Sequence, residues 1–200
     1  MKAAGMPERI SRRQIRPGVG HAPAVALVDP KYGHNVAGAL RACSAFGVGQ
    51  LWVTGERAIS EWSAHGRLPR EERMKAYGEV DVCLGDYFFD AFTADVTPVA
   101  VEVREQAEPL TTFQHPERAL YVFGPEDGGL HKTTLQRCHR FVIIPSDHCL
   151  NLAAAVNAVL LHRRMQRQLA GIEALRPSYA TLREHRGFAD TDEPFKWQMK

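Results

Sequence analysis

The sequence has few cysteines, and none are paired as metal ligands or as a disulfide framework would require. Cys43, Cys83, Cys138 and Cys149 stand far apart within apolar segments, and no C-x-x-C occurs. This spacing excludes the common zinc and dithiol redox motifs. We therefore expect four buried free thiols in a reducing compartment, the cytoplasm.

Long apolar runs and a secretory leader are also missing. No uninterrupted apolar stretch reaches the roughly 18 residues of a membrane-spanning helix. The first residues, MKAAGMPERISRRQIRPG, are basic but lack the apolar core and cleavage site of a signal peptide. We expect no membrane as a partner of this chain.

The chain carries little net charge, +2 over 200 residues, so composition alone does not indicate a polyanionic partner. Its arginines cluster in residues 9–16, 163–167 and 183–186, where they either pair with phosphates or lie solvated at the surface. A G-x-G-x-x-G after the first strand and a P-loop are both absent, which argues against an ordinary doubly wound nucleotide-binding enzyme. The histidines show no ligand spacing with carboxylates, so we expect no metal.

Short apolar segments alternate with helical ones along the chain. The segments APAVALVD, QLWVT, VDVCL, TPVAVEV, ALYVF and FVII have the composition of buried strands. Helices are predicted over 35–46 and, as a short one, over 86–92, whereas 55–78 is polar without a clear period. This alternation predicts an α/β fold: a mostly parallel sheet with helices on both faces.

The last long apolar stretch, residues 141–169, predicts a strand, a polar turn and a core helix. Asn151 stands where an N-cap belongs, and Asn35 stands in the same place before the 35–46 helix, which Gly47 is expected to end. The apolar positions of the last helix recur on one face: Leu152, Val156, Val159 and Leu160.

Three polar loops follow three of the predicted strands: DPKYGHN (29–35), GPEDGGL (124–130) and PSDHCLN (145–151). In an open α/β sheet, ligands bind at the carboxyl ends of the strands. If the three strands are neighbours, the loops converge, and we expect the binding site there.

These loops, with the residues after them, resemble the three motifs of the SpoU/TrmH-type RNA ribose methyltransferases of the SPOUT superfamily. The first motif is an Asn with an Arg six positions on, here Asn35 and Arg41 in NVAGALR. The second, FG-x-E-x-x-GL, is FGPEDGGL at 123–130. The third, an IP turn before an LN pair and a small-residue helix, is IIPSDHCLNLAAAV. The motifs occur in the family's order over most of the chain.

The resemblance implies a C-terminal deep trefoil knot, a homodimer, and S-adenosylmethionine bound in the knot in a bent form. It implies methyl transfer to a ribose 2′-hydroxyl of structured RNA, either tRNA or rRNA. Residues 1–22 then form a basic arm, 23–170 the methyltransferase domain, and 171–200 a C-terminal helix and tail. The arm either supplies RNA contacts to the other subunit's site or is unstructured.

Three residues are the catalytic candidates that the resemblance implies: Arg41, Asn35 and Glu126. A guanidinium is ordinarily protonated, so Arg41 either abstracts the hydroxyl proton with help from an RNA phosphate or orients that phosphate and stabilises developing oxyanion character. Asn35 orients Arg41 or the ribose, and Glu126 holds its loop or the RNA. His34 lies outside the motif but is a second candidate for proton transfer.

The cofactor pocket is expected from loop residues and their backbone groups. Gly124, Gly128 and Gly129 allow the second loop to turn tightly beside a ligand. Relatives usually have a longer turn between the Pro and the LN pair, and often Ser where Cys149 and Ala153 stand. The candidate cofactor residues are Val101, Gly124, Ile144, Cys149, Leu150, Asn151 and Ala153. Asn151 alternatively does no more than cap its helix.

One further function stays open from the sequence. A non-catalytic RNA-binding homologue would keep the fold and lose turnover. The retained Asn35, Arg41 and Glu126 argue against it, and Ala153 argues weakly for it.

Overall fold

A computed structural model describes residues 20–58, 60 and 80–174 of the chain. The chain forms two compact units, Met1–Arg164 and Met165–Lys200, and the first contains the sheet. Most of the predicted N-terminal arm, most of the polar stretch 55–78 and most of the predicted tail lie outside the described residues. The predicted domain boundaries therefore stay predictions.

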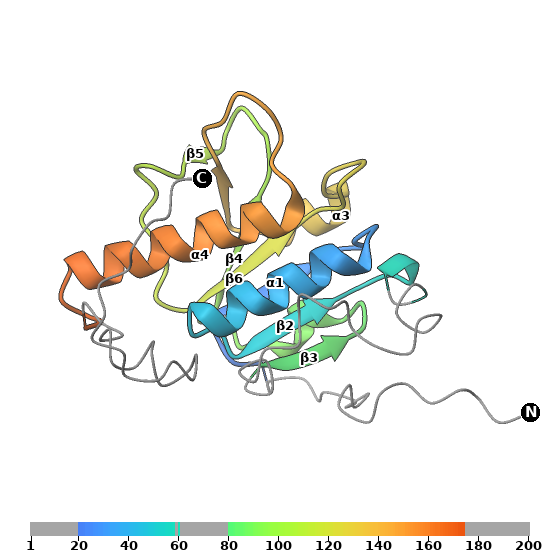
Figure 1. Ribbon diagram of the computed structural model, residues 1–200, viewed down its shortest axis with the longest axis horizontal. Coiled ribbons are helices and arrows are strands. Elements are labelled where there is room, and N and C mark those ends of the chain that lie inside the picture. The colour runs from blue at the N-terminus through green and yellow to red at the C-terminus, as the bar shows by residue number, and fades with distance from the viewer. Residues whose placement is uncertain (1–19, 59, 61–79, 175–200) are drawn as a thin grey trace, which may run out of the picture. The chain divides into compact units, whose positions relative to one another are not determined.

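Seven parallel strands form the sheet, in the order β3-β2-β1-β6-β4-β7-β5 (Figure 1). The chain runs outward from β1 through β2 to β3 and then crosses to the other side of β1. There β6 lies next to β1, and β4, β7 and β5 follow outward, so the order of the strands reverses between β1 and β6. This confirms the predicted parallel α/β fold. The strands are β1 (Ala24–Leu27), β2 (Gln50–Val53), β3 (Asp81–Leu84), β4 (Thr97–Val101), β5 (Glu108–Pro109), β6 (Ala119–Phe123) and β7 (Arg140–Ile143).

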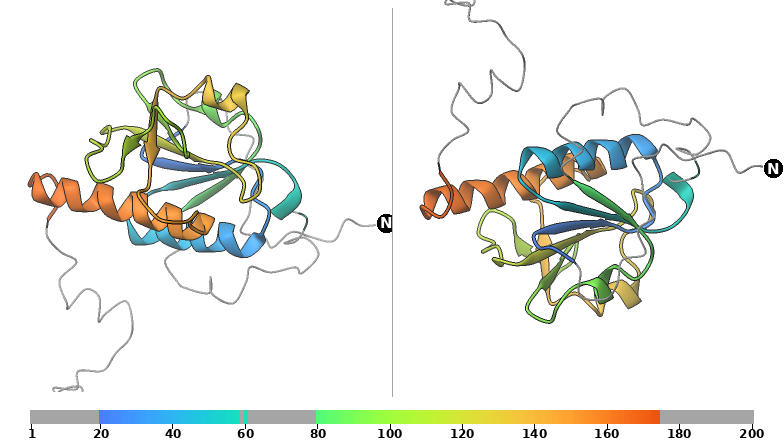
Figure 2. Two further views of the ribbon diagram at one scale, coloured as in Figure 1. Left: turned by 90° about the horizontal axis from the view of Figure 1, so that it is seen from above. Right: turned by 90° about the horizontal axis from the view of Figure 1, so that it is seen from below.

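Helices cover both faces of the sheet, as predicted (Figure 2). On one face, Val36 of α1 (Gly33–Ala45) and Val156 of α4 (Leu152–Leu169) are fully buried in one cluster with Tyr121 of β6. The other face packs against the 3₁₀ helix η3 (Phe88–Ala91) and the short α3 (Lys132–Leu135). Strands buried on both faces explain the continuous apolar runs in the sequence.

Helix α1 begins earlier than the sequence predicts. Its N-cap is Tyr32, which makes no side-chain cap hydrogen bond, and Asn35 lies in the first turn with a side chain only 2% exposed. The prediction of Asn35 as N-cap is therefore wrong, because its side chain bonds to other loops instead of to its own helix. The predicted end is confirmed: Gly47 has φ +72°, and the Val48 N–H donates to the Cys43 carbonyl at 2.9 Å.

Helix α4 begins as predicted. The Asn151 side-chain oxygen accepts hydrogen bonds from the backbone N–H groups of residues 153–154, at 2.9 and 3.3 Å, which confirms Asn151 as the N-cap. Arg163 was expected either to pair with a phosphate or to lie solvated at the surface, and it does neither. It is only 6% exposed and donates to the Glu117 carbonyl at 3.2 Å. It packs α4 against the loop before β6.

The cysteine prediction is correct for three residues and wrong for one. Cys43, Cys83 and Cys138 are buried free thiols, and burial raises the pKa of Cys43 and of Cys138 to about 12. Cys149 is exposed because it lies in the loop after β7, beyond the apolar strand that suggested burial.

Two short elements were not predicted, β5 and α3, because two and four residues carry no readable period. Among the described residues, no helix is long and apolar enough to cross a membrane.

Candidate functional site

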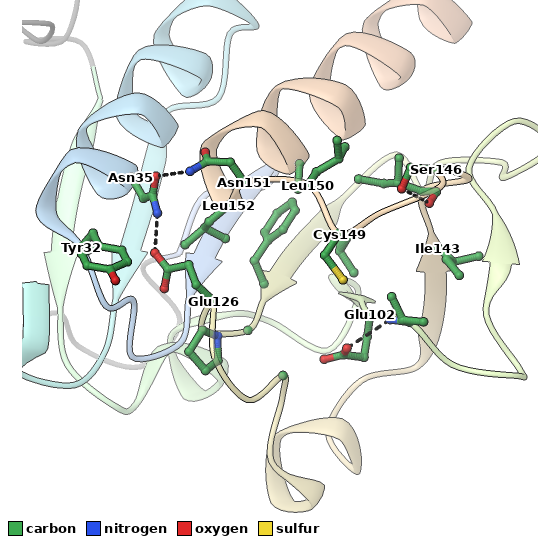
Figure 3. Close-up of a pocket in the computed structure, with 18 of the residues that line it drawn as sticks. Tyr32, Asn35, Glu102, Glu126, Ile143, Ser146, Cys149, Leu150, Asn151 and Leu152 are labelled. Atoms are coloured by element: carbon green, nitrogen blue, oxygen red, sulfur yellow. Dashed lines mark hydrogen bonds between the residues drawn. The ribbon is translucent and has the colours of Figure 1, made fainter.

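A pocket lies at the carboxyl ends of the central strands, beside the first turns of α1 and α4 (Figure 3). Its volume is about 480 Å³, within the range of small-molecule sites. The loops after β1, β4, β6 and β7 all contribute to its wall, so the three predicted loops do converge. The lining residues on which the chemistry depends are Tyr32, His34, Asn35, Val101, Glu102, Gly124, Glu126, Ile144, Cys149, Leu150 and Asn151.

A chain of hydrogen bonds joins the three loops (Figure 3). The Asn35 side-chain amide donates to a Glu126 carboxylate oxygen at 2.5 Å, and its carbonyl oxygen accepts from the Asn151 side chain at 2.7 Å. The other Glu126 oxygen accepts the Lys31 backbone N–H at 2.8 Å. Asn151 in turn caps α4. Each of the three motifs therefore contributes one member of this Glu126–Asn35–Asn151 chain.

The hydrogen bonds of this series keep Glu126 in its ionised, carboxylate form. Burial favours its neutral form, but the hydrogen bonds from the Lys31 backbone and the Asn35 side chain outweigh burial, so the pKa of Glu126 lies below its usual value. An ionised carboxylate that already accepts two hydrogen bonds is a poor proton acceptor. Glu126 is therefore suited to holding neighbouring groups in place rather than to taking a proton.

The second loop needs glycine at two of the three predicted positions. A Cβ on Gly124 would stand 2.8 Å from the Gly129 carbonyl carbon and 2.9 Å from the Leu130 nitrogen. Gly129 has φ +68° and faces Glu102. Gly128, in contrast, has open space around it. Glu102 fixes the end of this loop by accepting the Leu130 N–H at 2.7 Å.

An exposed group of charges braces the outer side of the same loops. The Arg57 guanidinium contacts Asp29 at 2.9 Å and Asp127 at 3.0 Å, and Lys31 contacts Asp127 at 3.4 Å. Asp29 itself has φ 46° and stands where any side chain on Gly55 would clash. The loops after β1, β2 and β6 are thus tied together outside the pocket.

Six of the seven predicted cofactor residues line the pocket, and the exception is Ala153. Its side chain faces Gly38, where an added Cβ would come within 2.7 Å of the Ala153 Cβ. The two small residues let α1 and α4 cross closely. Ala153 therefore has a packing role in the structure, as the second residue of the helix whose start lines the pocket.

Of the predicted catalytic residues, Asn35 and Glu126 line the pocket, and so does His34. Arg41 is exposed and does not line it. Arg41 is six positions after Asn35, which places it about 9 Å further along α1 and about 120° around the helix axis. The chain's own pocket thus lacks the arginine that the motif supplies.

The lining residues that were not predicted include two with polar side chains, Glu102 and Tyr32. Glu102 was included in an apolar strand, although a charge at the end of such a run is a signal for the strand's carboxyl end. Tyr32 lies in the loop already chosen as a site loop, and an aromatic residue two positions from His34 was the available signal. Among the described residues, no group of three His, Cys, Asp or Glu side chains is placed to hold a metal ion.

A parallel α/β sheet with a pocket of this size at the carboxyl ends of its strands defines a protein that binds a small molecule there. The chain belongs to the SpoU rRNA Methylase family, whose model matches residues 22–161. The resemblance of the three motifs is thereby confirmed at the level of the family.

Solved structures and a curated relative are similar to the chain. The SpoU methyltransferase AviRb from Streptomyces viridochromogenes, solved with AdoMet, matches with a TM-score of 0.59 and 21% identity, covering 78% of this chain and 60% of that one. A structure described as giving insights into the 2-OH methylation of C/U34 on tRNA has a TM-score of 0.58 and 25% identity, covering 74% and 96%.

The curated relative is a tRNA (cytidine-2′-O-)-methyltransferase TrmJ from Methanocaldococcus jannaschii. It is 28% identical over a match of 151 residues, and the match covers 68% of this chain and 65% of the relative. The chain thus spans slightly less than two thirds of the length of that protein.

Proposed function

We propose that the chain is an S-adenosylmethionine-dependent methyltransferase that acts on a ribose 2′-hydroxyl of tRNA or rRNA. The observation that carries the proposal is the Glu126–Asn35–Asn151 chain, which ties all three family motifs around one pocket. The AdoMet complex of AviRb and the names of the relatives support the cofactor and the RNA substrate. Its location in the cytoplasm belongs to the same proposal.

The pocket's chemistry fits S-adenosylmethionine. Val101, Ile144 and Leu150 provide apolar surface for an adenine ring. Within the described part of the chain, the backbone N–H groups of residues 149–151 donate to no other group, which leaves them for the cofactor. Glu102 and Glu126 give the pocket two carboxylates, which favour a cofactor with a positively charged sulfonium.

S-adenosylmethionine supplies an electrophilic methyl group when bound. The protein must align the ribose hydroxyl with it and help the hydroxyl lose its proton. Asn35, fixed on both sides by hydrogen bonds, orients the ribose, and Glu126 holds Asn35 and the Lys31 backbone in place. His34, at the pocket wall, is the group that accepts the proton, and Arg41 binds the adjacent RNA phosphate.

Arg41 reaches the pocket of a second subunit in this proposal. The exposed side of α4 carries Leu150, just before the helix, and Leu161, at 43% and 48% exposure, with Ala154 and Asn157 between them. We propose that two copies pair through this surface, called the α4 face below. Arg41 lies on α1 three residues after Gly38, where α1 crosses α4 closely, and its place beside the α4 face is part of the proposal. The C-terminal trefoil knot is also retained as a proposal, supported by the family's fold.

Calorimetry and methyl transfer test the function together. Wild-type protein should bind S-adenosylmethionine and transfer a labelled methyl group into total RNA from a strain lacking this gene. Arg41→Ala should keep the cofactor affinity and lose transfer at least 100-fold, on the order of one strong charged contact in the transition state. Arg118→Ala is the control, an exposed arginine paired with Asp95 before β6.

Two outcomes would contradict the proposal differently. If calorimetry detects no binding of S-adenosylmethionine at millimolar concentration, the chain is not a methyltransferase that uses this cofactor. Binding of cofactor and RNA without transfer would instead support the non-catalytic RNA-binding homologue.

A further inference from the structure

The pocket has two ends that differ in their residues (Figure 3). Cys149, Ile143 and Glu102 lie at one end, with the loops after β4 and β7, where most of the predicted cofactor residues gather. Tyr32 and Glu126 lie at the other end, with the loops after β1 and β6. If the cofactor takes the first end, the second end is left for the substrate nucleotide.

Two aromatic rings stand together at this second end. The rings of Tyr32 and His34 are stacked, with centroids 5.3 Å apart and planes inclined by 20°. Both residues line the pocket and both are exposed, Tyr32 at 42%. The Lys31 ammonium lies 5.4 Å from the centre of the Tyr32 ring. The site thus presents a stacked aromatic pair with a cation beside it, next to the Asn35 that orients the ribose.

The position of Tyr32 is unfavourable for its own helix. It is the N-cap of α1 and makes no side-chain cap hydrogen bond. Ser, Thr, Asp or Asn at such a position typically stabilises the helix relative to residues that cannot cap. A residue that forgoes this stabilisation at a pocket wall indicates a function for the ring itself.

We propose that Tyr32 and His34 form a stacking platform for the base of the nucleotide whose ribose is methylated. This inference rests on the proposed function and adds to it the residues that hold the target base. Proteins recognise unpaired RNA bases largely by stacking them on aromatic side chains. Each such contact contributes about 1–3 kcal/mol, and it tolerates different bases because each has a π-face.

The helix cap allows a test in which loss of folding is not a concern. Tyr32→Ser removes the ring but restores a capping hydroxyl, so α1 should be at least as stable as in the wild type. Tyr32→Phe keeps the aromatic ring and should therefore keep the wild-type KM for RNA, which Tyr32→Ser should raise. Tyr87→Ser is the matched control, because Tyr87 is also an N-cap without a cap hydrogen bond, is 78% exposed, and lies away from the pocket.

The readouts are the KM for total RNA in methyl transfer and the Kd for S-adenosylmethionine by calorimetry. Tyr32→Ser should raise the RNA KM by about 5- to 150-fold and leave the cofactor Kd within twofold. An unchanged RNA KM would overturn the platform, and so would a loss confined to cofactor affinity, which would assign the ring to the adenine.

Failure of the proposed function gives a separate result. If wild-type protein neither binds S-adenosylmethionine nor transfers a methyl group, that function is wrong whatever Tyr32 does. The platform is then judged by fluorescence anisotropy with labelled transfer RNA. Weaker RNA binding by Tyr32→Ser than by Tyr87→Ser would support it, and equal binding would overturn it.

Discussion

At the scale of single residues, Asn35 connects parts of the chain that are distant in sequence. Its two side-chain partners, Glu126 and Asn151, are 91 and 116 positions away. An amide suits this place because it donates on one side and accepts on the other. If Asn35 is replaced, the partly buried carboxylate of Glu126 and the amide of Asn151 each lose one hydrogen-bond partner. Leaving such a group without its partner lowers stability by more than the hydrogen bond itself contributes.

Asn35→Ala should therefore lower the free energy of unfolding by about 1–3 kcal/mol, measured by urea denaturation. Gln114→Ala, at an exposed site, should change it by less than about 0.5 kcal/mol. Equal stability of the wild type and Asn35→Ala would mean that the hydrogen-bond chain does not hold the three loops.

Gly124 and Gly128 offer a matched pair within one loop. Gly124→Ala forces a Cβ to within 3 Å of backbone atoms of Gly129 and Leu130 and should destabilise by about 1–3 kcal/mol. We also expect its affinity for S-adenosylmethionine to fall at least tenfold. Gly128→Ala meets open space, and thermal melting and calorimetry should find it close to wild type. Similar losses in both variants would show that the loop is sensitive to any side chain.

Much of the site at this scale was predictable, and the exceptions have physical reasons. Asn35, Glu126 and Asn151 carry sequence signals that need no tertiary contacts to recognise. The role of Asn35 was misjudged because an Asn at the start of a helix looks the same whether it caps the helix or bonds across the sheet. Glu102 was missed because its role is to accept the backbone N–H of Leu130, which lies 28 positions away in the sequence.

At the scale of elements, a partly buried relay of polar side chains connects α4 to the sheet. His115 bonds to the Tyr121 hydroxyl at 2.7 Å and to His162 of α4 at 2.9 Å. Burial, together with the charges of His162, Arg163 and Arg140, lowers the pKa of His115 to about 3. Burial also lowers the pKa of His162. Both rings therefore favour the neutral form in the folded protein.

The relay makes stability depend on pH in a defined window. Unfolded histidine binds a proton near pH 6.5, whereas folded His115 does so only near pH 3. Its contribution is complete above about pH 6.5 and is lost as the pH falls from there toward 3, by at most about 1.4 kcal/mol per pH unit and by less with partial exposure.

His115→Gln should flatten this slope between pH 7 and pH 5 in urea titrations, even if it lowers stability at pH 8. The exposed His139→Gln should keep the wild-type slope. A His115→Gln slope equal to that of the wild type would exclude the relay as its source.

The larger elements were predictable because each has a period or an apolar run that local sequence displays. Strands such as Ala119–Phe123 are buried on both faces, and α4 has a clear apolar stripe. The strand order depends on which edges pair, and no local pattern encodes that pairing. The short β5 and α3 exist only because neighbouring elements hold them.

At the scale of the whole molecule, the position of Arg41 and the exposed α4 face lead to one arrangement. A homodimer through the α4 face would bring Arg41 of each chain to the other chain's pocket. Mixing two inactive variants tests this directly. A dimer of one Arg41→Ala chain and one Glu126→Ala chain has one intact composite site only if Arg41 acts across the interface.

An equal mixture refolded together should therefore regain about a quarter of the wild-type transfer rate, as expected for random pairing of two chains. If Arg41 serves its own pocket, both sites of the mixed dimer carry a defect and no activity returns. Arg41→Ala mixed with Arg41→Ala,Glu126→Ala is the control that should stay inactive under either arrangement.

The central claim is that the pocket joined by Glu126, Asn35 and Asn151 delivers a methyl group to a ribose hydroxyl. The most direct measurement is mass spectrometry of nucleosides from RNA that lacks the modification, incubated with the protein and labelled S-adenosylmethionine. We predict label in 2′-O-methylated nucleosides, and its loss with Arg41→Ala. Label on a nucleobase, or no label although the cofactor binds, would contradict the account.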